Sequence, residues 1–166
     1  MTLLERDLET DLALSERQVF RHHGMTLEAC LRSGLLVQAV LVAPTVHRKV
    51  TRAVNFVMLE PLEFQPFEFR HLAATAEIRH QLQVDARDWQ VVQHAAQTSP
   101  DAIWHRGLET WAVEFDAGAY SRTVLLEKAQ AFQAGFDGQV WAVRSNARGK
   151  TVGSLVAHEP LIVHPF

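Results

Sequence analysis

Three acidic residues and a lysine near the ends of two predicted strands are the part of this chain best suited to chemistry. Asp101 follows a proline, Glu114 and Asp116 stand two residues apart in an apolar segment, and Lys128 lies on the helix predicted next. Carboxylates at adjacent strand ends can hold Mg²⁺ through their oxygens, and the ion can then polarise a phosphodiester and activate water. The cofactor we expect is Mg²⁺ if this site is active, and none otherwise.

A strand also predicts how two of these carboxylates are oriented. Side chains alternate along a strand, so Glu114 and Asp116 should point to the same face. Two like charges on one face repel each other unless a cation lies between them. That cation could be a metal ion held by Asp101, Glu114 and Asp116, with Glu77 as a further ligand. The alternative is a basic side chain from the following helix, such as Lys128.

Composition limits the class of protein. The chain has 166 residues, nearly half of them apolar, which suits one medium domain or two small ones. Its single cysteine, Cys30, rules out an internal disulfide, and its nine histidines lack the i, i+4 spacing of a zinc-binding helix. No apolar stretch approaches the roughly 18 to 20 residues that span a bilayer, and no signal peptide begins the chain. We therefore expect a cytoplasmic protein without a membrane partner.

The sequence has two basic concentrations, one around His47, Arg48, Lys49 and Arg52 and the other formed by Arg144, Arg148 and Lys150. A net charge of −3 argues against a protein that coats nucleic acid, because phosphate neutralisation needs excess lysine and arginine. A local basic cluster, His47, Arg48 and Lys49 with Arg52, could still contact the backbone. It lies between two apolar segments, as the tip of a hairpin would.

Residues 1–60 are predicted to form a winged-helix domain. A leucine stripe from Leu3 predicts a first helix, Ser15 and Thr26 are suited to cap a second and a third, and apolar strands follow over 35–42 and 50–59. Three helices followed by a hairpin is the winged-helix plan, with the third helix in the recognition position. Because that helix offers little beyond Arg32 for contacting DNA, protein contact or dimerisation remains an equal alternative.

Residues 61–70, with two prolines and alternating phenylalanines, are predicted to be an extended linker to a second domain over 71–166. In that domain the patterns predict a helix over 72–82, three strands, a second helix capped by Ser121 and a final strand over 140–143. The three strands are expected over 89–94, 101–105 and 110–116. The fold class is therefore α/β (α+β), and the order αβββαβ is that of the PD-(D/E)XK nuclease core.

Several segments carry a more specific resemblance. They are "LLERDLETDLAL", "RHLAATAEIRHQL", "SPDAIW", "WAVEFDAGAYSRTVLLEKAQAF" and "VWAVRSN". Together they resemble the replication-relaxation family of plasmid and mobile-element proteins, over about residues 3 to 144. The resemblance implies a winged helix joined to a PD-(D/E)XK-like domain. It matches Asp101 to the aspartate of the motif and Glu114 to its second acidic residue, whereas Asp116 replaces the lysine, for which Lys128 could substitute.

The sequence therefore leads to one functional expectation and two alternatives. We expect a DNA-binding factor in plasmid or mobile-element replication, relaxation or regulation, with a degenerate nuclease site. The first alternative is an active Mg²⁺-dependent endonuclease that uses Asp101, Glu114, Asp116 and Lys128. The second is a regulator that docks on a transcription or replication enzyme, through a protein partner or as a homodimer.

Overall fold

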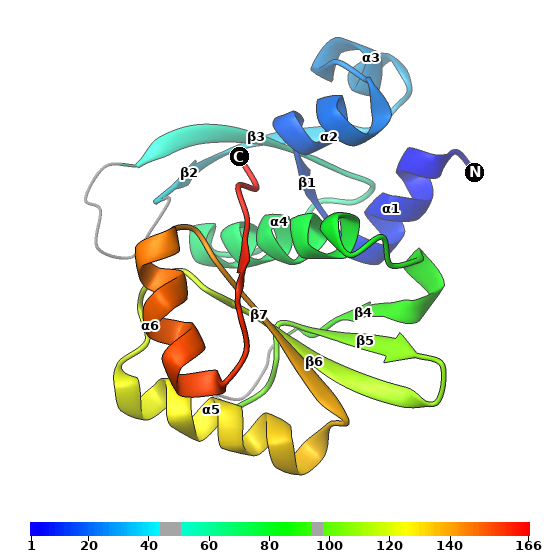
Figure 1. The fold of residues 1–166 in the computed structure, drawn as a ribbon. Helices are drawn as coiled ribbons and strands as arrows, with labels where there is room; N and C mark the ends of the chain where they lie inside the picture. Colours follow the sequence, from blue (N-terminus) through cyan, green and yellow to red (C-terminus); the bar gives the residue numbers. More distant parts are fainter. Residues whose placement is uncertain (44–50, 94–97) are drawn as a thin grey trace.

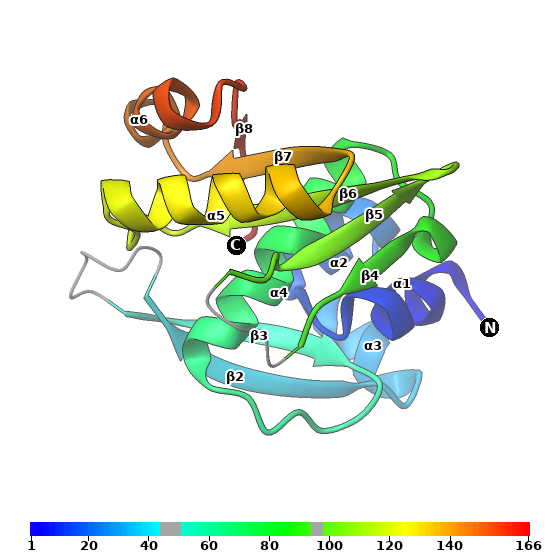
Figure 2. The same cartoon turned by 90° about the horizontal axis from the view of Figure 1, so that it is seen from below.

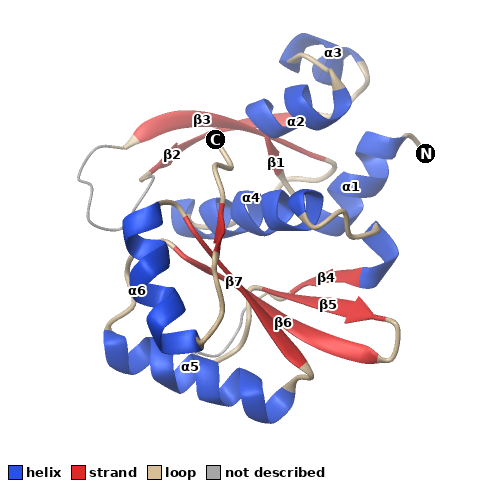
Figure 3. Ribbon diagram, in the orientation of Figure 1, coloured by secondary structure: helices blue, strands red, loops and turns tan. Residues whose placement is uncertain are grey.

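The structure, a computed structural model, describes residues 1–43, 51–93 and 98–166. Within these ranges the chain is a mixed α/β protein with six α-helices and two sheets (Figure 1). One sheet has three strands and belongs to the first third of the chain, and the other has five and belongs to the rest (Figure 3). None of the helices in the described ranges combines the length and the apolar character that a bilayer crossing requires.

The first part contains three helices and a small antiparallel sheet of order β1-β3-β2. Its elements are α1 (Leu3–Asp11), β1 (Leu14–Ser15), α2 (Glu16–His23), α3 (Leu27–Arg32), β2 (Leu36–Val42) and β3 (Arg52–Met58). Thr2, Ser15 and Thr26 cap the three helices with their hydroxyl groups, and Gly24 ends α2 in the left-handed region. The predicted helices and hairpin strands are confirmed, whereas the short strand β1 was not expected. His47, Arg48 and Lys49 lie outside the described residues.

The segment predicted to be an extended linker is helical in its second half. Helix α4 (Pro66–Gln81) begins at Pro66, where the missing N–H costs nothing because the first helical turn has no partner for it. The backbone N–H of Gln65 donates to the Glu68 carboxylate at 2.7 Å and fixes this start. The prediction that residues 61–70 are extended is therefore wrong from Pro66 onward, since prolines at the first helical position favour a helix.

Helix α4 lies between the two sheets and is buried on all its sides. Phe69 and Ala73 pack against β2 and β3, and Ala74 and Ile78 pack against the five-stranded sheet. Ala76 faces a third core, formed with α1, α2 and α3. Because α4 contributes to three cores, it fixes how the first part of the chain sits on the second.

The second sheet has the order β4-β5-β6-β7-β8, with antiparallel pairs up to β6 and parallel pairs after it. After the 3₁₀ turn Ala86–Asp88, its elements are β4 (Trp89–Val91), β5 (Ala102–Arg106), β6 (Glu109–Asp116), α5 (Arg122–Gly135), β7 (Gly138–Val143), α6 (Asn146–Val156) and β8 (Leu161–Ile162). The predicted order αβββαβ is confirmed from α4 to β7. Helix α6 and strand β8 were not predicted.

The two faces of this sheet have different coverings. Helices α5 and α6 cover one face, where Phe132 packs against Trp141, and α4 covers the other (Figure 2). Gly138 is required at the start of β7, because a Cβ there would lie 2.5 Å from the Trp111 ring. The last residues run from β8 across α4 to the first sheet, where the Ser15 hydroxyl donates to the Pro165 carbonyl at 2.5 Å.

Candidate functional site

A cleft of about 580 Å³ opens between α4 and the strands β4 and β5. The segments that line it include α4, β4, the residue before β5 and the first turns of α5. Its polar lining includes Arg70, His71, Asp101, Tyr120 and Lys128. Phe64, Phe67 and Val91 provide apolar walls. Clefts with apolar walls and a few converging polar groups are the usual form of a binding site.

Asp101 is fixed at the floor of this cleft by two partners. Its Oδ2 accepts the backbone N–H of Phe115 at 2.8 Å, and its Oδ1 lies 3.0 Å from Nδ1 of His71. Burial alone would raise the pKa of Asp101, but the neighbouring His71 and the Phe115 N–H together hold that pKa below its ordinary value. Asp101 is therefore an ionised carboxylate with both oxygens occupied.

Glu114 lies beneath the cleft and is fully buried, with 0% of its surface exposed. Its Oε1 accepts the Tyr120 hydroxyl at 2.8 Å and lies 2.9 Å from the Lys128 ammonium, while its Oε2 has no hydrogen-bond partner among the described residues. Burial and the charge of Asp101 raise the pKa of Glu114 well above its ordinary value, against the opposing effect of Lys128. Burial and Glu114 also raise the pKa of Tyr120, so its hydroxyl acts as a neutral donor.

Lys128 reaches back from α5 to the end of the strand, as its long side chain allows. Besides Glu114, its ammonium donates to the Ser99 carbonyl at 3.0 Å and lies 5.1 Å from the centre of the Tyr120 ring. A lysine in such a position is held by a carboxylate, a carbonyl and an aromatic face. Its charge is thereby directed at the floor of the cleft.

Asp116 has a separate cation. Arg148 of α6 donates from Nε to Asp116 Oδ2 at 2.6 Å, and its Nη2 lies 2.5 Å from the same oxygen. The other oxygen accepts the Gly118 N–H at 2.7 Å. Arg148 also donates to the Tyr120 carbonyl at 2.7 Å, which ties α6 to the loop before α5. We call these three acid–base pairs, Asp101–His71, Glu114–Lys128 and Asp116–Arg148, the cleft cluster.

The predicted site residues are thus gathered at one end of β5 and β6, but not around a shared metal position. In the described ranges, the one group of three or more potential ligands within 4.8 Å of each other lies elsewhere. The Glu77 carboxylate, the further candidate ligand, is bound by α2 instead, where Arg21 pairs with it and His22 Nε2 lies at 3.4 Å. Glu114 and Asp116 share a face, as predicted, and each has a basic partner of its own, Lys128 for Glu114 and Arg148 for Asp116.

Arg70, His71 and Tyr120 belong to the site but were not singled out by sequence reasoning. Arg70 donates to the Ala43 carbonyl at 3.2 Å, and its buried Nε lacks a hydrogen-bond partner in the described part of the chain. Burial lowers the pKa of this guanidinium. His71, next to Arg70 near the start of α4, was noted only as part of the segment "RHLAATAEIRHQL". Arg148 was noted only as one of the basic residues near the C-terminus, and its pairing with Asp116 was missed because α6 was not predicted.

The remaining predicted DNA contacts lie on the first part of the chain. Arg32 is exposed at the end of α3 and lies 3.9 Å from the Glu28 carboxylate. Arg52, also exposed at the start of β3, stands over the Phe166 ring at 5.0 Å. These two side chains are accessible, and each already has a neighbour that partly offsets or covers its charge.

No protein-family model matches the sequence, and neither a curated protein nor a solved structure is similar enough to count as a match. The function must therefore be inferred from the residues of the site themselves.

Proposed function

We propose that this protein is a DNA-binding factor whose nuclease-like site does not cleave DNA. One observation carries the proposal: each of the three carboxylates expected to hold Mg²⁺ is instead paired with a basic side chain. His71, Lys128 and Arg148 stand in place of the ion. The cleft is then a surface for binding rather than for hydrolysis.

The chemistry of Mg²⁺ supports this reading. The ion binds carboxylate oxygens at about 2.0 to 2.1 Å in near-octahedral geometry and keeps several waters. Asp101 has both oxygens in hydrogen bonds, and Glu114 is closed off from solvent beneath Lys128. A metal ion would have to displace a buried ammonium and leave it without a counter-charge, which is a costly arrangement.

The DNA-binding part of the proposal rests on residues 3–58. Their order, α1-β1-α2-α3-β2-β3 with the sheet order β1-β3-β2, is compatible with the winged-helix plan, and the basic residues 47–49 come between β2 and β3 in the sequence. The order α4-β4-β5-β6-α5-β7 supports a PD-(D/E)XK-like second domain. A role in plasmid or mobile-element replication, relaxation or regulation rests on the family resemblance alone.

DNA binding can be tested by fluorescence anisotropy on duplexes of unrelated sequence over a series of salt concentrations. The double variant Arg48→Ala/Lys49→Ala should weaken binding to all duplexes alike and lower the salt slope by roughly one to two. The matched control is Arg122→Ala/Lys150→Ala, which removes the same charge from exposed positions on α5 and α6. Equal affinity and salt slope in the two double variants would overturn the proposed wing contact.

A second candidate, a protein-interaction module that includes a homodimer, is favoured by the surface of α2 and α3. Phe20 is 65% exposed and Leu31 is 57% exposed, and both are large apolar residues. If this surface mediates self-association, sedimentation should show a dimer whose stability falls in Phe20→Ser and Leu31→Ser. A monomer at all concentrations would remove the homodimer form of this candidate.

A further inference from the structure

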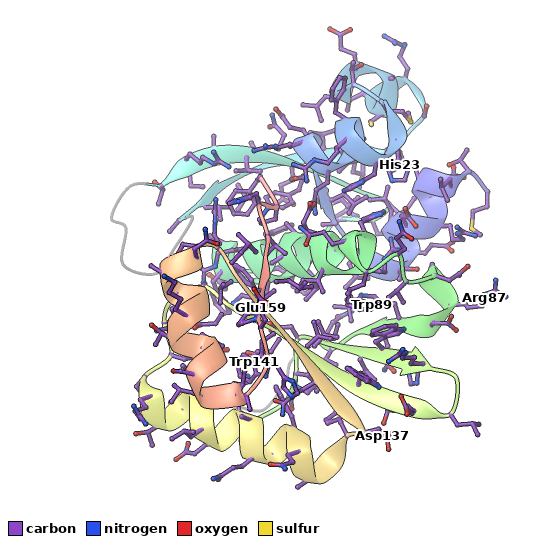
Figure 4. All side chains as sticks on the ribbon, in the orientation of Figure 1. His23, Arg87, Trp89, Asp137, Trp141 and Glu159 are labelled. Carbon is purple, nitrogen blue, oxygen red and sulfur yellow. The ribbon has the colours of Figure 1, made fainter. Side chains whose placement is uncertain are left out.

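A second group of ionisable side chains lies where α1, α2 and the end of α4 meet, away from the cleft. Asp7 and Asp11 come from α1, His23 from α2, and Arg79 and His80 from α4. His23 lies at the junction of α1 and α2 (Figure 4). We call these five residues the helical cluster. Neither the cleft chemistry nor the proposed DNA contact uses any of them.

Two imidazole nitrogens in this cluster converge on one carboxylate oxygen. His23 Nε2 lies 3.3 Å from Asp7 Oδ2, and His80 Nε2 lies 3.7 Å from the same oxygen. A tetrahedral zinc ion with ligand distances of about 2.0 to 2.1 Å separates its ligands by about 3.4 Å. The two separations from Asp7 Oδ2 are therefore close to an edge of a zinc tetrahedron, and the ligand atoms of Asp7, His23 and His80 all lie within 4.8 Å of one another.

One of these nitrogens has no other use. The His23 side chain is 4% exposed, and His23 Nε2 is a buried atom without a hydrogen-bond partner among the described residues, because its approach to Asp7 lacks hydrogen-bond geometry. Buried polar atoms normally have a partner, so an orphaned nitrogen that faces a carboxylate points to a missing ligand. The His80 side chain, 17% exposed, leaves solvent a path to supply a fourth ligand.

The charges of the cluster also favour a bound cation. Asp7 and Asp11 are both buried, and Arg79 is the cation that pairs with each of them. Burial raises the pKa of Asp11 to about 6, which leaves it ionised at neutral pH. The two buried carboxylates therefore share the one guanidinium of Arg79. His80 Nε2 lies 3.4 Å from Arg79 Nη2 and 3.7 Å from Asp7 Oδ2, so a metal ion bound by His80 would take the place of the Arg79 contact at this nitrogen.

We propose that Asp7, His23 and His80 form a binding site for one divalent transition-metal ion, with Zn²⁺ as the best match and water as the fourth ligand. Two imidazoles and a carboxylate are a donor set that Zn²⁺ commonly takes. Arg79 remains on Asp11, where Nε and Nη2 bind at 3.1 and 2.6 Å, and holds the second oxygen of Asp7 at 3.0 Å. It thereby orients the carboxylate ligand. The ion would fasten α1 and α2 to α4.

The test uses the whole protein after metal removal with a chelator. Titration with Co²⁺ should give the intense visible absorption of a tetrahedral site, and competition with Zn²⁺ should give one equivalent bound and a higher Tm. His23→Gln and His80→Gln should each weaken Zn²⁺ binding by at least about 100-fold. Circular dichroism establishes that each variant is folded, and the more exposed His80 allows the test even if His23→Gln does not fold.

Two control variants separate this site from other sources of binding. His158→Gln removes an exposed histidine and should leave Zn²⁺ affinity unchanged. Glu114→Gln alters the cleft cluster and should also leave it unchanged. Absence of a saturable one-to-one complex would overturn the proposal, as would wild-type affinity in a folded His80→Gln variant. Neither result would bear on DNA binding.

Discussion

The cleft cluster and the helical cluster are both buried groups of charges anchored on α4, the first near its start and the second near its end. In the cleft cluster three carboxylates face three basic side chains, and each pair is joined by its own short contact. In the helical cluster two carboxylates share the single guanidinium of Arg79. Each carboxylate of the cleft cluster has a basic partner of its own, whereas the two of the helical cluster depend on one arginine.

Acidic residues alone therefore do not identify a metal site. A buried carboxylate needs a counter-charge, and a basic side chain can supply it as well as an ion can. The carboxylates that looked like metal ligands in the sequence have such partners. His23 Nε2, which has no hydrogen-bond partner among the described residues, lies in a cluster that no sequence motif marks.

The largest loss of stability is expected when Arg79 is replaced, because two buried carboxylates pair with its guanidinium. Arg79→Met should lower the free energy of unfolding by about 3 to 5 kcal/mol, since it leaves Asp7 and Asp11 buried without a cation. Urea unfolding followed by circular dichroism measures this loss. Adding Asp11→Asn to Arg79→Met should recover part of the lost stability. If the losses of the two single variants simply add in the double variant, the pairing of Arg79 with Asp11 does not stabilise the fold.

A smaller loss is expected for Lys128, which serves one carboxylate. Lys128→Met should cost about 2 to 3 kcal/mol, because Glu114, whose pKa is already raised, can take up a proton instead of remaining charged. The same urea unfolding measures it. In the Glu114→Gln background the substitution should cost clearly less, and an undiminished loss would show that Lys128 stabilises the fold by packing rather than by this pair.

The pH dependence of stability should have opposite signs at the two carboxylates of the cleft. Glu114 has a folded pKa above its ordinary 4.5, so the folded state binds more protons and loses stability as pH rises through that window. The stability of Glu114→Gln relative to that of the wild type should therefore increase as the pH rises above about 4.5. Asp101 has a folded pKa below 3.8, so the stability it contributes is present above that pH and is lost as the pH falls further.

Asp101→Asn supplies the matched comparison for this experiment. Its deficit relative to wild type should be constant near neutral pH and should shrink below about pH 3.8. Thermal unfolding from pH 3 to 8 measures both differences. If the stability differences of Glu114→Gln and Asp101→Asn from the wild type change with pH in the same direction, the two carboxylates do not have the opposed environments described above.

The smallest effect is expected at an exposed ion pair. Arg87 lies 3.2 Å from the Asp85 carboxylate on the turn before β4, where its side chain points into solvent (Figure 4). Water and salt screen such a pair, so Arg87→Ala should leave unfolding unchanged within error. A loss comparable to that of Lys128→Met would mean that burial does not set the ranking of these ion pairs.

Local signals in the sequence predicted much of the fold. Ser15, Thr26 and Ser121 cap helices through contacts within three residues, and Gly107 makes the turn between β5 and β6, so a short stretch of sequence contains the cause. Residues 66–70 were mistaken for extended chain because proline was treated as a breaker rather than as a first helical residue. Strand β1, with two residues, is too short to leave a periodic pattern.

The parts of the sites that escaped prediction depend on distant packing. Arg148 reaches Asp116 only because α6 returns to the sheet, and the sequence between them gives no spacing signal. Asp7, His23 and His80 belong to three helices whose approach is decided by the burial of α4. The alternation along β6 did predict that Glu114 and Asp116 share a face, but not which cation each would find.

The most direct test of the central claim is a plasmid assay with Mn²⁺ that follows mobility shift and nicking in the same reaction. Because each cleft carboxylate is already paired with His71, Lys128 or Arg148, the wild-type protein should retard supercoiled plasmid without nicking it at any Mn²⁺ concentration. Nicking by the wild type that disappears in a folded Lys128→Ala variant would contradict this account and would identify an active endonuclease.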